Sequence, residues 1–141
     1  MTHDIHNIRT ALESAGLEIY QAHKDELEIA ERVRVHMMDS GVRVAVDGNL
    51  RVRFSARLQR SDAPAAAPDE LFARVAEVVG APAVERGYEE TDRRTVEVKD
   101  PMDESKTLDT WHELVFERPV SEAELIDEVR WAIGVEKYVS P

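Results

Sequence analysis

The chain has 141 residues, no cysteine and a formal net charge of −11. Its length predicts one domain with a sizeable core, and the lack of cysteine excludes disulfides and thiol chemistry. The acidic charge argues against non-specific binding to nucleic acid or to an anionic membrane. The N-terminal segment lacks the apolar run of a signal peptide, and no stretch reaches the about 18 apolar residues of a membrane span. We therefore expect a soluble, cytoplasmic protein.

The first predicted element is a helix from about Asp4 to Ala15. Thr2 or Asp4 suits the cap at its start, and Gly16 suits the left-handed position after its end. Its apolar side chains recur at helical spacing and form one stripe: they are Ile5, Ile8, Leu12 and Ala15. The weak alternation that follows, over Leu17–Gln21, is typical of a short strand.

The stretch Leu27–Gln59 alternates apolar and polar residues with a period of two, which predicts a three-stranded antiparallel meander with one solvent-facing side. We place its turns at Asp39-Ser40-Gly41 and Asp47-Gly48-Asn49, because these residue types tolerate positive φ. A helix over Lys24–Met38 is the alternative, but the β-branched residues favour a strand. Alternation places the apolar side chains of this stretch together on the other side, which faces the core. They include Leu27, Ile29, Val33, Val35, Met37, Val42, Val44, Val52 and Phe54.

Ser61–Pro68 has the composition of a mobile surface loop, with two prolines and no apolar side chain larger than alanine. A second helix is predicted over 69–79. Pro68 suits its first turn, the acidic residues that follow suit the positive end of its dipole, and Gly80 ends it. Val84–Tyr88 is either an edge strand or an irregular link.

Two more strands are predicted, Thr95–Lys99 and Leu108–Arg118, joined by a polar hairpin loop over Pro101–Thr107. Pro119 ends the second strand, because proline cannot donate to a strand ladder. Alternation within the second strand places Leu114 and Phe116 on one side and Trp111, Glu113, Val115 and Glu117 on the other.

A last helix begins at the capping-box pattern formed by Ser121 and Glu124 and runs to about Val135. The order of elements is therefore α-β-β-β-α-β-β-α, with room for a fourth early strand. Strands in hairpins predict a two-layer α+β fold with an antiparallel or mixed sheet, meander 27–59 plus hairpin 95–118, covered on one face by helices. We expect one domain over residues 1–141.

Six arginines of the meander have the parity opposite to the apolar residues and so share the solvent-facing side of the predicted sheet. They are Arg32, Arg34, Arg43, Arg51, Arg53 and Arg57. One interpretation is a surface for a carboxylate or phosphate, which guanidinium groups bind in pairs. The interpretation we favour is a cross-strand ladder in which Glu97, Glu113 and Glu117 neutralise these arginines.

The histidines and carboxylates do not complete a metal or catalytic pattern. His3 and His6 are three residues apart on a predicted helix, but no nearby cysteine or histidine adds further ligands. His36 or His112 as a catalytic base is the third and weakest hypothesis, since no nucleophile or paired carboxylate is spaced to work with either. The sequence predicts no metal and no cofactor.

The two tryptophans are candidate contact residues. Trp111 has the solvent-facing parity of its strand, and Trp131 projects away from the apolar stripe of the last helix. An exposed tryptophan often marks an interface. A core wider than the predicted one accounts equally well for both residues.

The architecture resembles that of the small acidic chaperones of bacterial type III secretion systems. The resemblance rests on the order of the predicted elements and on no residue motif: helix 4–15, meander 27–59, helix 69–79, hairpin 95–118 and capped helix 121–135. It implies a homodimer, formed through the second helix and the later strands, that binds an extended segment of a client protein and has no catalytic residues.

The leading hypothesis is therefore a non-enzymatic, homodimeric protein-binding module, acting as a chaperone or adaptor. Its expected partners are another protein or a second copy of the chain, with neither nucleic acid nor membrane. The alternative is a protein that binds a small molecule or an anion on the arginine-rich side of the sheet.

Overall fold

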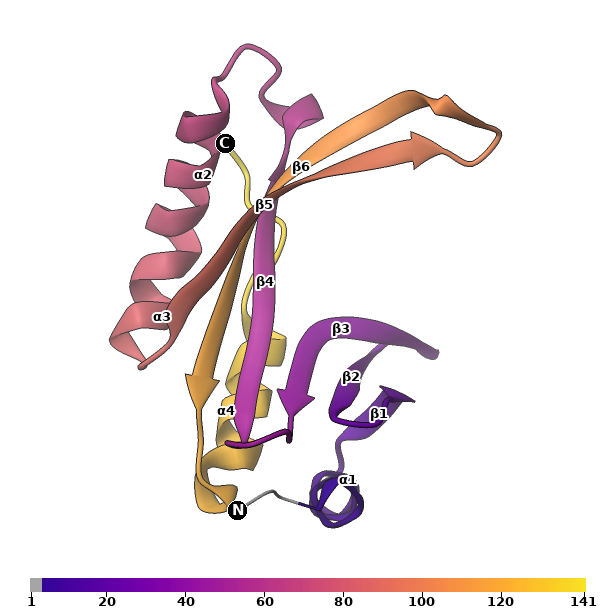
Figure 1. Cartoon of the computed structure of the whole chain (residues 1–141), viewed down its shortest axis with the longest axis vertical. Helices are drawn as coiled ribbons and strands as arrows, with labels where there is room; N and C mark the ends of the chain where they lie inside the picture. Colours follow the sequence, from indigo (N-terminus) through magenta and orange to yellow (C-terminus); the bar gives the residue numbers. More distant parts are fainter. Residues whose placement is uncertain (1–3) are drawn as a thin grey trace. The chain divides into compact units, whose positions relative to one another are not determined.

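The computed structural model describes residues 4–141, which form an α+β fold with one six-stranded sheet in the order β1-β2-β3-β4-β6-β5 (Figure 1). The predicted class is confirmed. In chain order the elements are α1 (Ile5–Ser14), β1 (Glu18–Ala22), β2 (Glu26–Val33), β3 (His36–Ala45), β4 (Arg51–Gln59), η1 (Arg60–Asp62), α2 (Pro68–Val75), η2 (Ala76–Gly80), α3 (Ala81–Glu85), β5 (Glu89–Asp100), β6 (Asp103–Pro119) and α4 (Glu122–Gly134).

The chain divides into two compact units. Unit 1 contains the chain up to Phe54 together with Glu117–Val135, and unit 2 contains Ser55–Phe116 together with Glu136–Pro141. The single domain expected from the chain length stays a prediction. Within residues 4–141, none of the helices combines the length and the apolar content that crossing a bilayer requires.

Helix α1 begins and ends where the sequence predicts. The Asp4 carboxylate accepts a hydrogen bond from the His6 backbone N–H at 2.9 Å, which caps the first turn. Ile8 and Leu12 are buried, and Gly16 has the predicted positive φ, +89°. Thr2, the other candidate cap, lies outside the described residues.

Strand β2 pairs antiparallel with β1 and with β3, so the strand interpretation of this stretch is confirmed. The first turn of the meander, however, lies at Arg34-Val35 and not at Asp39-Ser40-Gly41, which falls inside β3. Ile29 faces Val42 and Ala30 faces Asp39, so Ser40 and Gly41 have no partner on β2 and form a β-bulge.

The same polar chemistry that closes turns closes this bulge, which explains the wrong prediction. The Asp39 carboxylate accepts from the Gly41 N–H at 2.8 Å. The buried Ser40 hydroxyl donates to the Ile29 carbonyl at 2.6 Å and accepts from the Val42 N–H at 3.2 Å. The second predicted turn, at 47–49, is correct.

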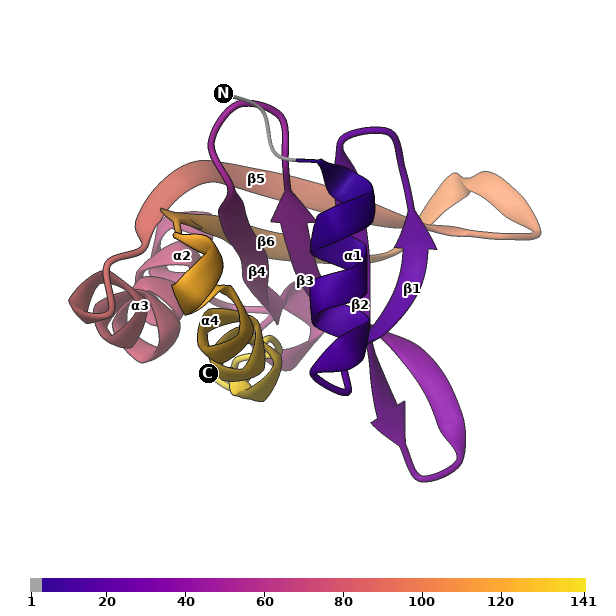
Figure 2. The ribbon, with the colours of Figure 1, turned by 90° about the horizontal axis from the view of Figure 1, so that it is seen from below.

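The core of unit 1 lies on one face of its strands. The buried side chains include Leu27, Ile29, Val42, Val44, Val52 and Phe54. Helices α1 and α4 lie against this face (Figure 2), and the Arg130 guanidinium of α4 donates to the Ala15 carbonyl at the end of α1 at 2.7 Å. The predicted capping box of α4 is present, with Ser121 and Glu124 each accepting from the other's N–H.

Unit 2 contains the helical run α2–η2–α3. Pro68 occupies the first turn of α2 as predicted. Gly80 does not end the helix as predicted, because its backbone is helical (φ −63°) and α3 follows it directly. Of the two alternatives for Val84–Tyr88, the edge strand is wrong: α3 extends to Glu85, and an irregular link with a turn at Arg86-Gly87 follows it. Pro82 supports that helix by occupying its first turn, where no backbone donor is needed.

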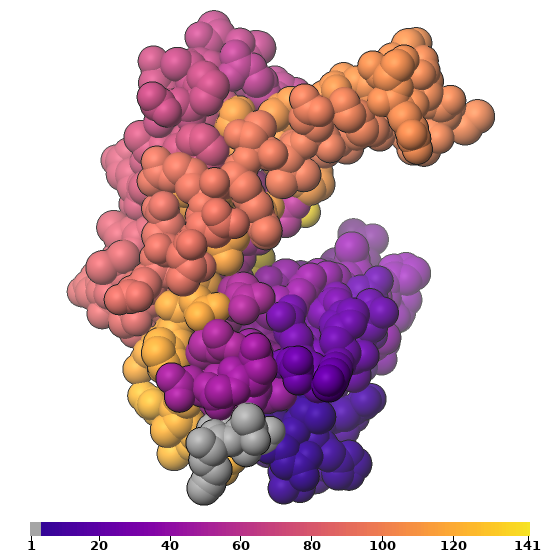
Figure 3. All heavy atoms as spheres, in the orientation of Figure 1, coloured from indigo at the N-terminus to yellow at the C-terminus, as the bar shows by residue number. Residues whose placement is uncertain are grey.

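The β5–β6 hairpin is longer than predicted. Its turn consists of Pro101 and Met102 alone, so the loop expected over 101–107 is wrong. Beyond the helices of unit 2 the two strands continue as a narrow arm, drawn in orange (Figures 1 and 3). Most side chains of β5 are exposed and polar, so period-two alternation of apolar residues indicated its part from Thr95 to Lys99 but could not reveal its full length.

The segment Ser61–Pro68 starts in the 3-10 turn η1 and continues through bends. The Ser61 hydroxyl donates to the Asp109 carboxylate at 2.7 Å, and the Ser61 N–H donates to it at 3.1 Å. These bonds fix one end of the segment to β6. Its mobility stays a prediction.

Candidate protein-binding surface

The arginines of unit 1 that lie on the face opposite the helices form a continuous row of ion pairs with carboxylates. Arg53 lies between Glu26 and Glu117, with N···O distances of 3.1 and 3.0 Å. Arg51 lies 3.6 Å from the other oxygen of Glu117, and Arg43 lies 3.7 Å from Glu26. The predicted neutralisation by Glu117 is therefore present.

Further carboxylates complete this neutralisation. Arg43 forms a bidentate pair with Asp39 at 2.7 and 2.8 Å, and Arg51 pairs with Asp47. On the neighbouring strands Arg32 binds both oxygens of Glu18 at 2.8 and 2.9 Å, and these hydrogen bonds lower the pKa of Glu18. Of the six predicted arginines, only Arg34 has no carboxylate partner among residues 4–141.

Two of the predicted site residues, Arg57 and Trp111, come together in unit 2. The Arg57 guanidinium carbon lies 4.4 Å from the Trp111 ring centroid and 5.1 Å from that of Tyr138. The buried Glu113 carboxylate lies 3.6 Å from Arg57 Nε and 2.7 Å from an Arg94 nitrogen. Glu113 therefore neutralises Arg57, as predicted.

Glu97 does not join the arginines. Its carboxylate pairs with Lys99 at 2.9 Å on the same strand. Trp131 is half-buried, and its ring packs edge-on against Phe54 with a centroid distance of 5.8 Å. For Trp131 this packing agrees with the second interpretation of the tryptophans, a core wider than the predicted one.

The two histidines considered as bases lie in different environments. His36 is exposed on β3, whereas His112 is buried on β6, where its ring packs edge-on against Phe72 at 5.1 Å. Burial lowers the pKa of His112, and the charge of Arg60 lowers it further. Its Nδ1 lies 3.4 Å from the Thr95 hydroxyl, and its Nε2 has no hydrogen-bond partner among the described residues.

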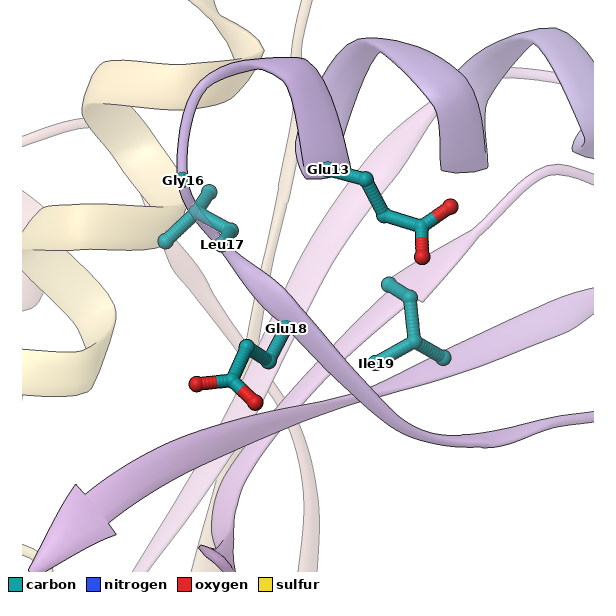
Figure 4. Close-up of a pocket in the computed structure, with 5 residues that line it drawn as sticks. All are labelled: Glu13, Gly16, Leu17, Glu18 and Ile19. Carbon is teal, nitrogen blue, oxygen red and sulfur yellow. The ribbon is translucent and has the colours of Figure 1, made fainter.

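A shallow hollow of about 330 Å³ lies between the end of α1 and β1, lined by Glu13, Gly16, Leu17, Glu18 and Ile19. Figure 4 shows the two carboxylates pointing in different directions. Glu13 pairs with Arg9 and Glu18 with Arg32. The residues from 4 to 141 contain no cluster of histidine and carboxylate side chains that fits a metal ion. His3 lies outside that range.

The most unusual surface of unit 1 is the distal end of the β2–β3 hairpin, residues 31–39, which we call the hairpin end. It extends past β1 and α1 (Figure 2). Its apolar side chains are exposed: Val35 by 80%, Met38 by 50%, Val33 by 46% and Met37 by 45%. Three of them, Val33, Val35 and Met37, were predicted as core residues, and this prediction is wrong.

The strand register explains why these side chains reach solvent. Cross-strand pairs share a face, so Val33 with His36 and Glu31 with Met38 lie on one side of the hairpin, and Arg32 with Met37 lies on the other. The last residue of β2 that pairs with β1 is Ala30. Beyond the bulge the hairpin therefore continues as a two-stranded ribbon.

The turn of this hairpin contains backbone strain. Arg34 has φ of +60°, the one positive φ at a non-glycine position among residues 4–141. Positive φ at the first turn residue alone is typical of a turn type that favours glycine there. Strain of this kind gathers at functional positions, and here it accompanies the exposed apolar side chains.

Charge also distinguishes the hairpin end from the rest of the chain. It carries Glu31 and Asp39 against Arg32 and Arg34, two minus two, so its formal charge is zero in a chain of −11. Two copies of an acidic protein repel each other least where the local charge is zero. The hairpin end is therefore a locally uncharged part of an acidic chain.

The sequence pattern contained no signal for this surface. Val33, Val35 and Met37 continue the alternation of the residues that are buried, so alternation alone assigns them to the core. No protein-family model, curated protein or solved structure matches the chain. Its function is therefore inferred from its own residues.

Proposed function

We propose that this protein is a protein-binding module that forms a homodimer through the hairpin end. The observation that carries the proposal is the exposure of Val33, Val35, Met37 and Met38 at one end of one hairpin. These side chains lie on both sides of the ribbon and at its turn, and apolar side chains exposed together at one place on a protein are typical of interaction sites. Methionine suits such a contact, because its flexible side chain adapts to the facing surface.

A second copy fits the chemistry of this patch. A two-fold interface brings the same residues together from both copies, so Val33 and Met38 of one copy meet their counterparts. In such a contact Arg34 would find the carboxylate that it lacks within residues 4–141, supplied by Glu31 of the other copy. The contact then buries apolar surface without burying net charge.

The dimer would serve a chaperone-like or adaptor role in the cytoplasm, binding an extended segment of a client protein. This part of the proposal is supported by the resemblance of the predicted element order to the small acidic secretion chaperones. Anion binding by the arginine side of the sheet is the weaker candidate, since carboxylates within the chain already occupy Arg43, Arg51, Arg53 and Arg57.

Light scattering on a sizing column, repeated on dilution, tests the proposal. The wild-type chain should have twice the monomer mass of 16.0 kDa. Met38→Glu should shift the mass towards the monomer, because two added carboxylates would face each other in the contact. Met102→Glu is the matched control: it adds the same charge at the exposed tip of the β5–β6 arm and should leave the dimer intact. A monomeric wild type, or equal effects of both variants, would contradict the proposal.

A further inference from the structure

A second surface, in unit 2, indicates a different kind of binding. The segment Lys137–Val139 lies beside β4 (Figure 1) and pairs with it in parallel at Arg57. The Arg57 N–H donates to the Lys137 carbonyl at 2.8 Å, and the Val139 N–H donates to the Arg57 carbonyl at 2.8 Å. The register of β3 on β4 covers only Arg51–Phe54. The segment therefore satisfies backbone groups on the part of β4 beyond β3.

The side chains of this segment fit specific features of unit 2. Val139 is buried, whereas Tyr138 is 58% exposed and its ring lies over the Arg57 guanidinium. Trp111 lies on the same guanidinium at 4.4 Å. The edge thus offers one backbone donor, one backbone acceptor, a cation flanked by aromatic rings and a place for an aliphatic side chain. Sites that bind a peptide as an added strand have the same features: backbone groups that pair with the peptide, and pockets that select its alternate side chains.

The segment pairs with β4 as an isolated parallel bridge and not as a full strand. Next to the bridge, Arg74 Nε donates a hydrogen bond to the Ser140 carbonyl at 3.3 Å. Arg57 Nε, although buried, has no hydrogen-bond partner among residues 4–141. Short edge pairings of this kind open without unfolding the rest of a domain.

We infer that the Arg57 edge of β4 is a strand-addition site for an extended segment of a partner protein that carries an aromatic residue followed by an aliphatic one. Lys137–Val139 occupies the site in cis and competes with that partner. The net charge of −11 favours a partner segment with basic flanks. This site is separate from the hairpin end and does not depend on dimer formation.

The test uses the full chain with Trp131→Phe, so that Trp111 is the remaining tryptophan. Val139→Asp in this background releases the cis segment, because it puts a charge in a buried aliphatic position. The probe is the synthetic peptide EKYVSP, which copies residues 136–141, and the control peptide replaces its tyrosine with alanine. Binding is followed through the fluorescence of Trp111.

We expect saturable binding of EKYVSP to the Val139→Asp chain, and about 10-fold weaker binding to the chain with Val139, because the cis segment occupies the site most of the time. The alanine peptide should bind poorly to both. Equal binding of the two peptides, or no binding by a Val139→Asp chain whose circular dichroism is unchanged, would overturn the inference. The same assay in a Met38→Glu background should give the same result, which separates this site from the hairpin end.

Hydrogen exchange of the unsubstituted chain covers the case in which Val139→Asp does not fold. The Val139 amide should exchange faster than that of Phe54 in the core, and EKYVSP should change its rate. Exchange of the Val139 amide only through global unfolding would show that the segment is a fixed part of the sheet, and would overturn the inference.

Discussion

The Ser40 hydroxyl lies 2.6 Å from the Ile29 carbonyl oxygen, across the β2–β3 pair at the bulge. Both residues are buried, and the bond spans the two strands at the point where their register shifts. The bulge marks the point where the hairpin changes from a covered sheet to an exposed ribbon. The apolar hairpin end therefore depends on a polar contact inside the core.

Ser40→Ala should destabilise the protein by about 1–3 kcal/mol, because it leaves the buried Ile29 carbonyl without its donor. Urea unfolding followed by circular dichroism measures the change. Ser14→Ala, at an exposed position on α1, is the control and should change stability by less than about 0.5 kcal/mol. Equal stability of the Ser40 variant and the wild type would show that the bulge does not need this bond.

Arg34→Gly should stabilise the protein by about 1 kcal/mol, because glycine adopts the positive φ of this turn without steric cost. Arg34→Ala removes the same guanidinium but keeps a Cβ, so it should give no such gain. The two variants separate backbone strain from the loss of charge. Thermal unfolding of both against the wild type measures the difference, and a larger gain for alanine would refute the strain.

Glu113 and Glu117, which pair with arginines of β4, should differ in how much they contribute to stability. Glu113→Gln leaves the largely buried Arg57 without its counter-ion and should cost about 3 kcal/mol. Glu117→Gln weakens pairs that solvent partly screens and should cost about 1 kcal/mol. Glu97→Gln, on an exposed pair with Lys99, is the control. Chemical unfolding gives the order, and a reversal of the first two would contradict this account of the ion pairs.

Stability should fall as the pH drops below about 6.5, partly because of His112. Burial lowers the pKa of this histidine in the folded protein below its ordinary value of 6.5. The unfolded chain therefore binds more protons in that range, so acid favours unfolding, and the contribution is fully present above pH 6.5. His112→Phe keeps an aromatic ring against Phe72 and should reduce the loss of stability between pH 7.5 and pH 5.0. An unchanged loss would show that His112 stays unprotonated in the unfolded chain or is accessible in the folded one.

Much of the fold was predictable from the alternation of apolar residues and from helix-capping residues. Period-two alternation identified β2, β4 and the second halves of β3 and β6, and the capping-box residues located α4. The turn at 34–35 was not predictable, because arginine gives no sign of positive φ. The bulge in β3 was taken for a turn because both use the same polar residues.

The candidate surfaces were predictable only in part. Parity alone placed Arg57, Trp111 and Glu113 on one side of the sheet, and the structure brings these three together. Parity also assigned Val33, Val35 and Met37 to the core. Alternation shows which side chains share a face, but it does not show where the elements that cover that face end, and here β1 pairs no further than Ala30.

The contact between two hairpin ends is tested most directly by a distance measured between copies. The chain contains no cysteine, so Val35→Cys provides a single site for a spin label at the turn of the hairpin, and Met102→Cys provides the control at the tip of the β5–β6 arm. Double electron–electron resonance on the labelled Val35→Cys protein should give one short and narrow inter-label distance, which Met38→Glu abolishes. An absence of any inter-label distance from Val35→Cys, or a distance that Met38→Glu leaves unchanged, would contradict a dimer formed through this surface.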